Sequence, residues 1–270
     1  MKSTLGGLSG SSRKRLGKVL NRAQIITVTT AVEALGLNRK AAAKLLSGWA
    51  QRGWLSRVGR GIYVPISLDA KTTEQGIEEP WVIAQQLYEP CYIAGLSAAE
   101  HWDFTEQIFN SLFVVTGKPI NKRRRSFGSL RLVIKSVPQK FIFGTQGIWF
   151  RKVKVQVSDP SRTVVDLLAD PRMGGGIRTV FDIVKEYFKS PHCDPKLLVN
   201  HAVQLDNSSV FKRLGFFLEK HLPKETGLIK ICRSKLKTGY SQLDPSSPSK
   251  KLATSWNLWV PEAFLRTSDD

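Results

Sequence analysis

The chain has 270 residues, enough for one large domain or two ordinary ones, and carries a formal charge of +19. A hydrophobic content of 41% excludes a wholly disordered basic tail. No apolar run approaches the roughly 18–20 residues that a membrane span needs, and the N-terminus lacks the apolar stretch of a secretory signal.

The three cysteines, Cys91, Cys193 and Cys232, are odd in number and far apart. Such usage is typical of free thiols in a reducing compartment rather than of a disulfide framework or a zinc site. We therefore expect a soluble, cytoplasmic protein. The pI near 10.1 indicates that polyanions are attracted, but charge alone does not identify the partner.

The positive charge is concentrated in the first seventy residues, which hold twelve Lys and Arg against Glu33 and Asp69. Hydrophobic spacing predicts three helices there. They are expected at 13–23, from a cap at Thr29 or Thr30 to Ala34 or Leu35, and at 39–52 with Asn38 as the cap.

A hairpin is predicted after the third helix. The β-prone runs 54–58 and 62–64 are joined around Gly59, Arg60 and Gly61, where glycine permits a tight turn. Three helices followed by a basic hairpin indicate a winged helix-turn-helix, whose third helix enters the major groove beside the hairpin. We assign this domain to residues 1–66.

Donor-rich side chains on these elements are the candidate DNA contacts. Arg and Asn can read guanine and adenine edges, whereas Lys more often holds phosphate. The candidates are Arg13, Lys14, Asn38, Arg39, Lys40, Lys44, Ser47, Arg57 and Arg60. The alternative, a merely solvated basic helix, is disfavoured because charge, helix spacing and hairpin all agree.

The rest of the chain predicts a larger mixed α/β domain with a helical C-terminal part, so the fold class is α+β. A polar, acidic linker at 67–80 precedes this domain at 81–232, and an irregular tail follows at 233–270. Helices are expected at 81–87, 95–102, 159–169, 177–189, 195–205 and 208–221, and strands at 112–116, 130–137 and 148–157.

A second basic cluster is expected in a loop between strands of the larger domain. It consists of Lys122, Arg123, Arg124 and Arg125. The cluster could extend the DNA footprint, meet an acidic partner protein or be a solvated charge run, and the sequence leaves these readings open.

No catalytic, metal or cofactor site is expected. The four histidines lack metal-ligand spacing, and Gly174, Gly175 and Gly176 lack the flanks of a phosphate loop and are interpreted as a flexible hinge. The densest polar set suits a helix N-cap and helix-surface pairs better than a two-carboxylate site. This set is Asp159, Arg162, Asp166 and Asp170.

Three stretches, in this order, resemble the AbiEi antitoxins of the AbiE abortive-infection system, a type IV toxin–antitoxin group. They are the winged helix with RGWL at 52–55 and VGRGIY at 58–63, YIAGLSAAEH at 92–101, and VSDPSRTVVDLL at 157–168. The resemblance covers roughly residues 15–220. The basic C-terminal tail of the chain departs from the family pattern.

The resemblance implies a bacterial transcriptional repressor that binds inverted repeats in its own promoter, and we expect it to be non-enzymatic and to need no cofactor. It also implies that the larger domain counters a cognate nucleotidyltransferase-like toxin, without a stable complex. Arg39, Lys40, Lys44 and Arg60 lie where family DNA contacts are expected. Two alternatives stay open: a degenerate nuclease or transferase domain that would need Asp159, Asp166 and Asp170, and a ligand-responsive winged-helix regulator.

Overall fold

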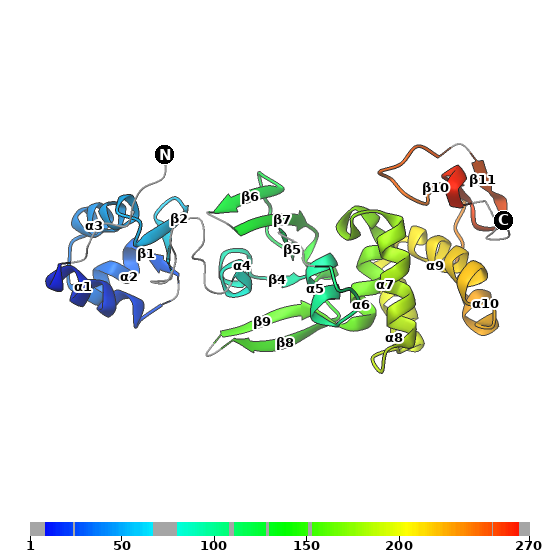
Figure 1. Ribbon diagram of the computed structural model, residues 1–270, viewed down its shortest axis with the longest axis horizontal. Helices are drawn as coiled ribbons and strands as arrows, with labels where there is room; N and C mark the ends of the chain where they lie inside the picture. Colours follow the sequence, from blue (N-terminus) through cyan, green and yellow to red (C-terminus); the bar gives the residue numbers. More distant parts are fainter. Residues whose placement is uncertain are drawn as a thin grey trace.

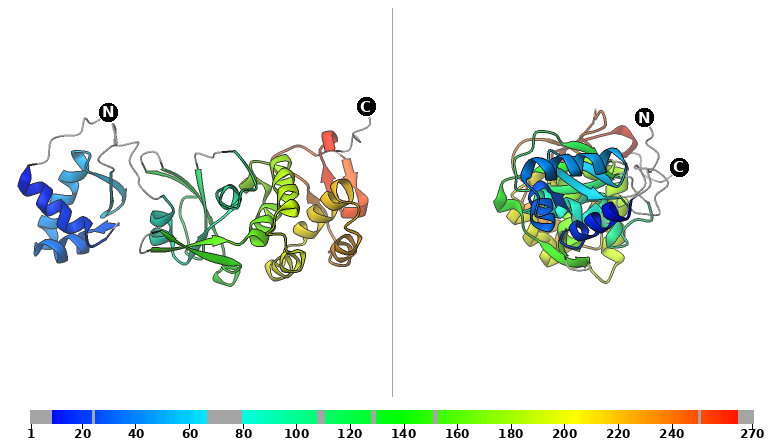
Figure 2. Two further views of the ribbon diagram at one scale, coloured as in Figure 1. Left: turned by 60° about the horizontal axis from the view of Figure 1, so that its bottom comes forward. Right: turned by 90° about the vertical axis from the view of Figure 1, so that its left-hand side faces the viewer.

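The computed structural model describes residues 9–23, 25–66, 80–107, 111–127, 130–150, 153–249 and 251–264. It combines helices and strands, so the predicted α+β class is confirmed. An N-terminal unit (residues 9–66) lies at one end, a six-stranded sheet in the middle, and helices with a small sheet at the other end (Figure 1, Figure 2). We call residues 80–264 the second unit. None of the described helices is long and apolar enough to cross a bilayer.

The N-terminal unit has the predicted three helices and hairpin. Its helices are α1 (Gly10–Leu20), α2 (Val28–Leu35) and α3 (Arg39–Gln51), and its strands are β1 (Ile26–Thr27), β2 (Leu55–Gly59) and β3 (Ile62–Pro65), in the sheet order β1-β3-β2. The core of the unit joins Val19 of α1, Ala31 of α2 and Leu46 and Trp49 of α3. Packing of these apolar faces holds the three short helices together.

The first two helices begin earlier than expected. α1 starts at Gly10 because Ser9 caps it. α2 is capped by Thr27, not by Thr29 or Thr30: Thr27 Oγ1 accepts a hydrogen bond from the Thr30 amide at 3.1 Å, and Thr30 Oγ1 accepts one from the Thr27 amide at 3.3 Å. This reciprocal pair satisfies two amide groups that would otherwise lack acceptors.

A mixed six-stranded sheet forms the middle of the second unit. Its order is β6-β7-β5-β4-β9-β8, and its strands are β4 (Cys91–Ile93), β5 (Ser111–Thr116), β6 (Arg124–Phe127), β7 (Leu130–Ser136), β8 (Thr145–Phe150) and β9 (Val153–Ser158). Sequence patterning predicted one strand at 148–157, and this prediction was wrong. The segment reverses direction, and β8 pairs antiparallel with β9, with Trp149 opposite Lys154.

The two faces of this sheet belong to different cores. Ile93 and Val114 face α4 (Pro80–Tyr88), whereas the adjacent Tyr92 and Val115 face α5 (Gly95–His101) and the helices that follow. This alternation is expected for a strand pair whose successive side chains point to opposite faces. The later helices are α6 (Pro160–Ala169), α7 (Ile177–Lys189), α8 (Pro195–Leu205) and α9 (Ser208–His221), and the predicted spans 177–189, 195–205 and 208–221 are confirmed.

The C-terminal segment was expected to be irregular, but it forms regular secondary structure. After α10 (Thr226–Ser234), a small sheet forms in the order β10-β12-β11, from β10 (Ser241–Gln242), β11 (Lys251–Ala253) and β12 (Leu258–Val260). Leu243, Trp256, Leu258 and Val260 are buried in the helical core. Leu258 and Val260 alternate with the exposed Trp259 in a strand of only three residues, which is too short for spacing alone to identify in the sequence.

The glycine run is a packed turn rather than the expected flexible hinge. Residues Pro171–Gly174 form a 3-10 helix, and Gly175 and Gly176 have φ of +74° and +118° before α7 begins. The Ile177 amide donates a hydrogen bond to Asp244 Oδ2 at 3.0 Å, which fixes the start of α7 against the C-terminal segment. Residues 67–79 of the expected linker at 67–80 lie outside the described residues, and Pro80 begins α4.

Candidate nucleic-acid interface

The third helix presents a basic face because its apolar face is buried. Ala42, Leu46 and Trp49 are at most 1% exposed and pack into the core of the N-terminal unit. Lys40 and Lys44, one helical turn apart, lie on the exposed face. The predicted contacts Arg39, Lys40 and Lys44 are therefore brought together on one accessible surface, whereas Ser47 is half-buried at its edge.

Asn38 caps α3 in addition to being a predicted DNA contact. Its Oδ1 accepts a hydrogen bond from the Ala41 amide at 2.8 Å and caps α3, as the sequence predicted. The carboxamide oxygen is thus committed to the helix start, and only the Nδ2 group has free donors. Asn38 can donate to a base edge from Nδ2, but the cap orients its carboxamide toward the helix start and so constrains the two-sided contact with adenine.

The exposed cations of the N-terminal unit have no acidic partners among the described residues. Arg13 and Lys14 are exposed on α1, away from the buried Leu16 and Val19. No ion pair within the described part of the chain involves a Lys or Arg of residues 9–66. Their charge is therefore available to a polyanion rather than neutralised inside the unit.

The wing is built from β2 and β3, which turn at Gly61 with φ of +71°. Arg60 is exposed at its tip. Arg57 is also exposed, and its Nε donates to the carbonyl of Gly59 at 3.2 Å across a bulge in the hairpin. The bulge and this hydrogen bond hold the tip in shape, so both predicted wing residues remain accessible.

The wing does not stand free, which the sequence did not indicate. Tyr63 faces the core of the N-terminal unit, whereas Val58 and Val64 on the other face are 2% and 0% exposed and belong to the apolar cluster that contains α4 and the six-stranded sheet. Burial on both faces joins the hairpin to the second unit. The wing tip is therefore presented at a boundary between two cores.

The second basic cluster lies beside this boundary. It was expected in a loop, but Arg124 and Arg125 begin β6, the edge strand that pairs with β7 and lies against β2. Lys122, Arg123 and Arg124 are exposed, and Arg125 is half-buried. Sequence reasoning missed Lys118, which precedes this cluster and lies on the same side, because no local pattern links it to the wing.

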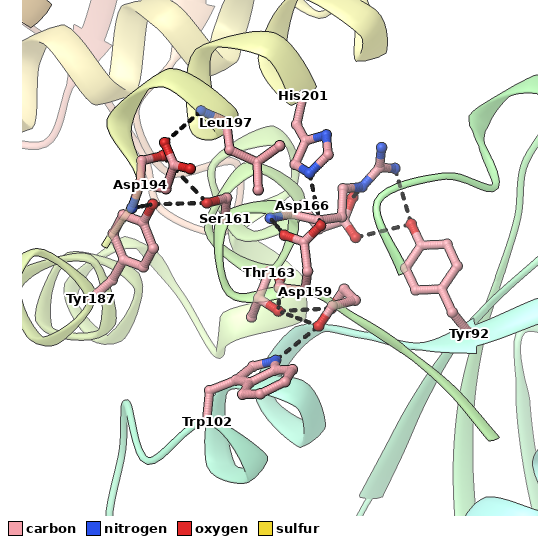
Figure 3. A network of polar contacts seen from close by, with 12 residues as sticks. Tyr92, Trp102, Asp159, Ser161, Thr163, Asp166, Tyr187, Asp194, Leu197 and His201 are labelled. Carbon is pink, nitrogen blue, oxygen red and sulfur yellow. Dashed lines mark hydrogen bonds and ion pairs between the residues drawn. The ribbon is translucent and has the colours of Figure 1, made fainter. Parts of the chain in front are cut away.

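A separate polar network surrounds the start of α6 (Figure 3). Asp159 caps the helix, as predicted: its Oδ1 accepts from the Arg162 amide at 2.7 Å. Its Oδ2 lies 2.8 Å from Nε2 of His201 on α8. Trp102 Nε1 donates to the carbonyl of Ser158 at 2.8 Å. These contacts hold α5, α6 and α8 together.

The pairs expected on the surface of α6 are in fact buried. Arg162 Nε lies 3.0 Å from Asp166 Oδ1, and Tyr92 donates to Asp166 Oδ2 at 2.9 Å while accepting from Arg162 Nη2 at 3.0 Å. Burial raises the pKa of Asp166, against the opposing charge of Arg162, and burial also raises the pKa of Tyr92. Tyr92 therefore stays a hydrogen-bond donor at neutral pH. The network is a buried core element that fastens α6 to β4, although Arg162 Nη1 has no hydrogen-bond partner among the described residues.

Comparison with known proteins supports the assignment of the N-terminal unit. The family described as a transcriptional regulator, AbiEi antitoxin, matches residues 14–66, which extend from α1 to the end of β3. The AbiEi resemblance predicted from the sequence is confirmed over this segment. No curated protein matches the chain.

A solved structure resembles nearly the whole chain. The crystal structure of the RV2827C protein from Mycobacterium tuberculosis matches with a TM-score of 0.63 and 14% identity, over 96% of this chain and 94% of that one. At this identity the likeness establishes a shared fold. The overall fold of the chain therefore recurs over nearly its whole length in another protein.

Proposed function

We propose that this chain, whose residues 14–66 match the AbiEi antitoxin regulator family, is a DNA-binding transcriptional repressor of its own promoter. In this proposal α3 enters the major groove of inverted repeats and the wing lies along the backbone. The second unit counters a cognate nucleotidyltransferase-like toxin.

The observation that carries the proposal is the exposed basic face of α3. Arg39, Lys40 and Lys44 project from a helix whose opposite side is anchored by Leu46 and Trp49, and no carboxylate among the described residues neutralises them. A rigid cationic helix of this kind suits the major groove, whose phosphates flank it on both sides. Binding should weaken strongly as salt rises, because each neutralised phosphate releases counterions.

The test uses the full chain and a duplex fragment of its own promoter, with binding measured by fluorescence anisotropy over a range of KCl concentrations. The double variant Lys40→Gln/Lys44→Gln should bind more weakly, and its slope of log K against log salt should be shallower by about 2, since each phosphate contact contributes roughly 0.9. The matched control Lys196→Gln/Lys224→Gln removes the same charge from exposed positions of the second unit. Wild-type protein that leaves the fragment free at low salt would overturn the proposal.

The antitoxin role is placed in the second unit because the two functions then use different surfaces. Co-expression with the candidate toxin should restore growth for wild-type protein and equally for Lys40→Gln/Lys44→Gln, although the variant represses its promoter more weakly. If the variant fails to protect at matched expression, the separation of the two roles is wrong. Because no stable complex is expected, rescue of growth is the readout rather than co-purification.

The proposal includes no catalysis by this chain. The three carboxylates that a metal-dependent nuclease or transferase would need are already engaged by other groups. Asp159 contacts His201, Asp166 contacts Arg162, and Asp170 Oδ1 lies 2.7 Å from Arg172 Nε. A metal ion would have to displace these partners, two of which are permanently charged guanidinium groups. Incubation of DNA and RNA with the protein and Mg²⁺ or Mn²⁺ should therefore yield no cleavage.

A further inference from the structure

The wing and the second unit line an open cavity of about 390 Å³. Val58, Gly59, Arg60 and Ile62 line it from the wing, and the segment from Lys118 to Asn121 lines it from the second unit, together with Leu87, Tyr88 and Arg125. Its size falls within the roughly 300–1,000 Å³ of ordinary ligand sites. We call this cavity the seam.

The seam is cationic. Arg60, Lys118 and Arg125 line it, and none of its lining residues is acidic. Within the described part of the chain, none of these three side chains forms an ion pair. Like charges gathered without a counter-charge repel one another, and they are stabilised when an anion enters between them.

Arg125 supplies a second, independent indication. Its Nε is buried and has no hydrogen-bond partner among the described residues. A buried donor of this kind is costly unless an acceptor reaches it, and a guanidinium group is well matched in shape to the oxygens of a phosphate. The structure thus leaves one donor of Arg125 unsatisfied, and the same side chain lines the cationic cavity.

The two sides of the seam are held at a fixed separation. Val58 and Val64 of the wing are buried in the apolar cluster of the second unit, and β2 lies against β6. Because the cations on the two sides are already in position, less conformational entropy is lost when a ligand binds between them.

We infer that the seam is a phosphate clamp that extends the DNA interface from the wing onto the second unit. One strand of the duplex passes the wing tip, and a backbone phosphate enters between Arg60 on one side and Lys118 and Arg125 on the other. Further cations continue the track outward along the start of β6: Lys122, Arg123 and Arg124 are all exposed. The inference rests on the proposed DNA-binding function and assigns part of that interface to the second unit.

A nucleic-acid backbone fits this surface better than an acidic protein does. Protein interfaces are centred on buried aromatic or aliphatic anchors. The large apolar side chains that are exposed in the described residues lie elsewhere: Trp149, Leu197, Val203, Ile231, Tyr240 and Trp259. The seam sets Arg60, Lys118 and Arg125 among apolar lining residues, and the β6 edge adds exposed cations. A duplex offers phosphates at regular intervals to cations spaced along such a surface.

The test measures binding of the full chain to a labelled duplex of its own promoter, and separately to a duplex of mixed sequence, over a range of KCl concentrations. Lys118→Gln/Arg125→Gln should weaken binding to both duplexes alike, because phosphate contacts do not depend on sequence, and should make the salt slope shallower by about 2. Hydroxyl-radical footprinting should show protection lost at the end of the site next to the wing and retained under α3. The control Lys196→Gln/Lys224→Gln should behave as wild type.

Because Arg125 is half-buried, a second variant guards against loss of folding. Lys118→Glu changes an exposed side chain and should weaken binding in the same way with an unchanged thermal transition. If Lys118→Glu and the double variant both bind DNA with wild-type affinity and slope, while Lys40→Gln/Lys44→Gln is weakened, the seam inference fails and the proposed function stands. If the seam variants bind DNA normally but lose protection against the toxin, the seam serves a protein partner and the inference is likewise wrong. If wild-type protein binds neither duplex, the proposed function itself fails.

Discussion

The guanidinium of Arg162 and the carboxylate of Asp166 form an ion pair inside the second unit, with Nε and Oδ1 3.0 Å apart and side chains only 2% and 8% exposed. Tyr92 bridges the same two groups from β4, on the opposite side of the interface. Sequence spacing predicted that Arg162 and Asp166 lie on the helix surface. In the structure the pair is buried and links α6 to the sheet.

We predict that Asp166→Asn lowers the free energy of unfolding by about 3 kcal/mol, because it leaves the buried guanidinium of Arg162 without its counter-charge. Urea unfolding followed by circular dichroism measures the change. The control is Glu186→Gln, which breaks the exposed pair with Lys189 and should cost less than about 1 kcal/mol. Equal losses in the two variants would show that the buried pair contributes no more than a surface one.

The two roles of Asn38 can be separated by choice of substitution. Asn38→Ala removes the cap of α3 and should lower stability by about 1 kcal/mol, whereas Asn38→Ser keeps a capping oxygen and should cost little. Both remove the free carboxamide donor, so both should alter base preference in a promoter-variant binding panel. A Ser variant with unchanged preference would restrict Asn38 to its capping role.

Substitutions of Arg60 and Arg39 should affect DNA binding in different ways. Arg60 is exposed at the wing tip and contacts backbone in our proposal, so Arg60→Ala should weaken binding to all duplex sequences by a similar factor. Arg39 is exposed at the first position of α3 and contacts base edges in our proposal, so Arg39→Ala should change the ranking of promoter variants. An Arg60→Ala variant with unchanged affinity and salt slope would count against the wing assignment.

The C-terminal segment depends on close approach to α9 at Gly215. A Cβ added there would overlap the ring of Trp256, which is 1% exposed and also hydrogen-bonds to Glu219. Gly215→Ala should therefore lower stability by about 1–3 kcal/mol through overpacking. Gly227→Ala, where the added Cβ meets nothing within 4 Å, is the matched control and should leave stability unchanged or slightly higher. Tryptophan fluorescence during thermal unfolding reports both.

Local patterns predicted the elements of the winged helix and of the helical region well. Helical spacing placed α7, α8 and α9, and the capping residues Asn38 and Asp159 were identified because a cap is a contact within one turn of chain. Local patterns failed where the chain reverses or where partners are remote. Residue spacing predicts one strand where the β8–β9 hairpin forms, and the packing of Trp256 on Gly215 joins residues far apart in sequence.

The candidate site likewise has features that the sequence predicted and features that depend on the tertiary structure. Composition and helical periodicity alone determined that residues 9–66 present an exposed cationic helix and hairpin, because burial of one apolar face dictates where the opposite face points. Only the tertiary structure decided that the wing is buried on both faces, that Arg60 faces Lys118 and Arg125 across a cavity, and that Arg162 and Asp166 are inside the protein. These outcomes depend on which surfaces meet after the elements form, and local sequence carries no record of that pairing.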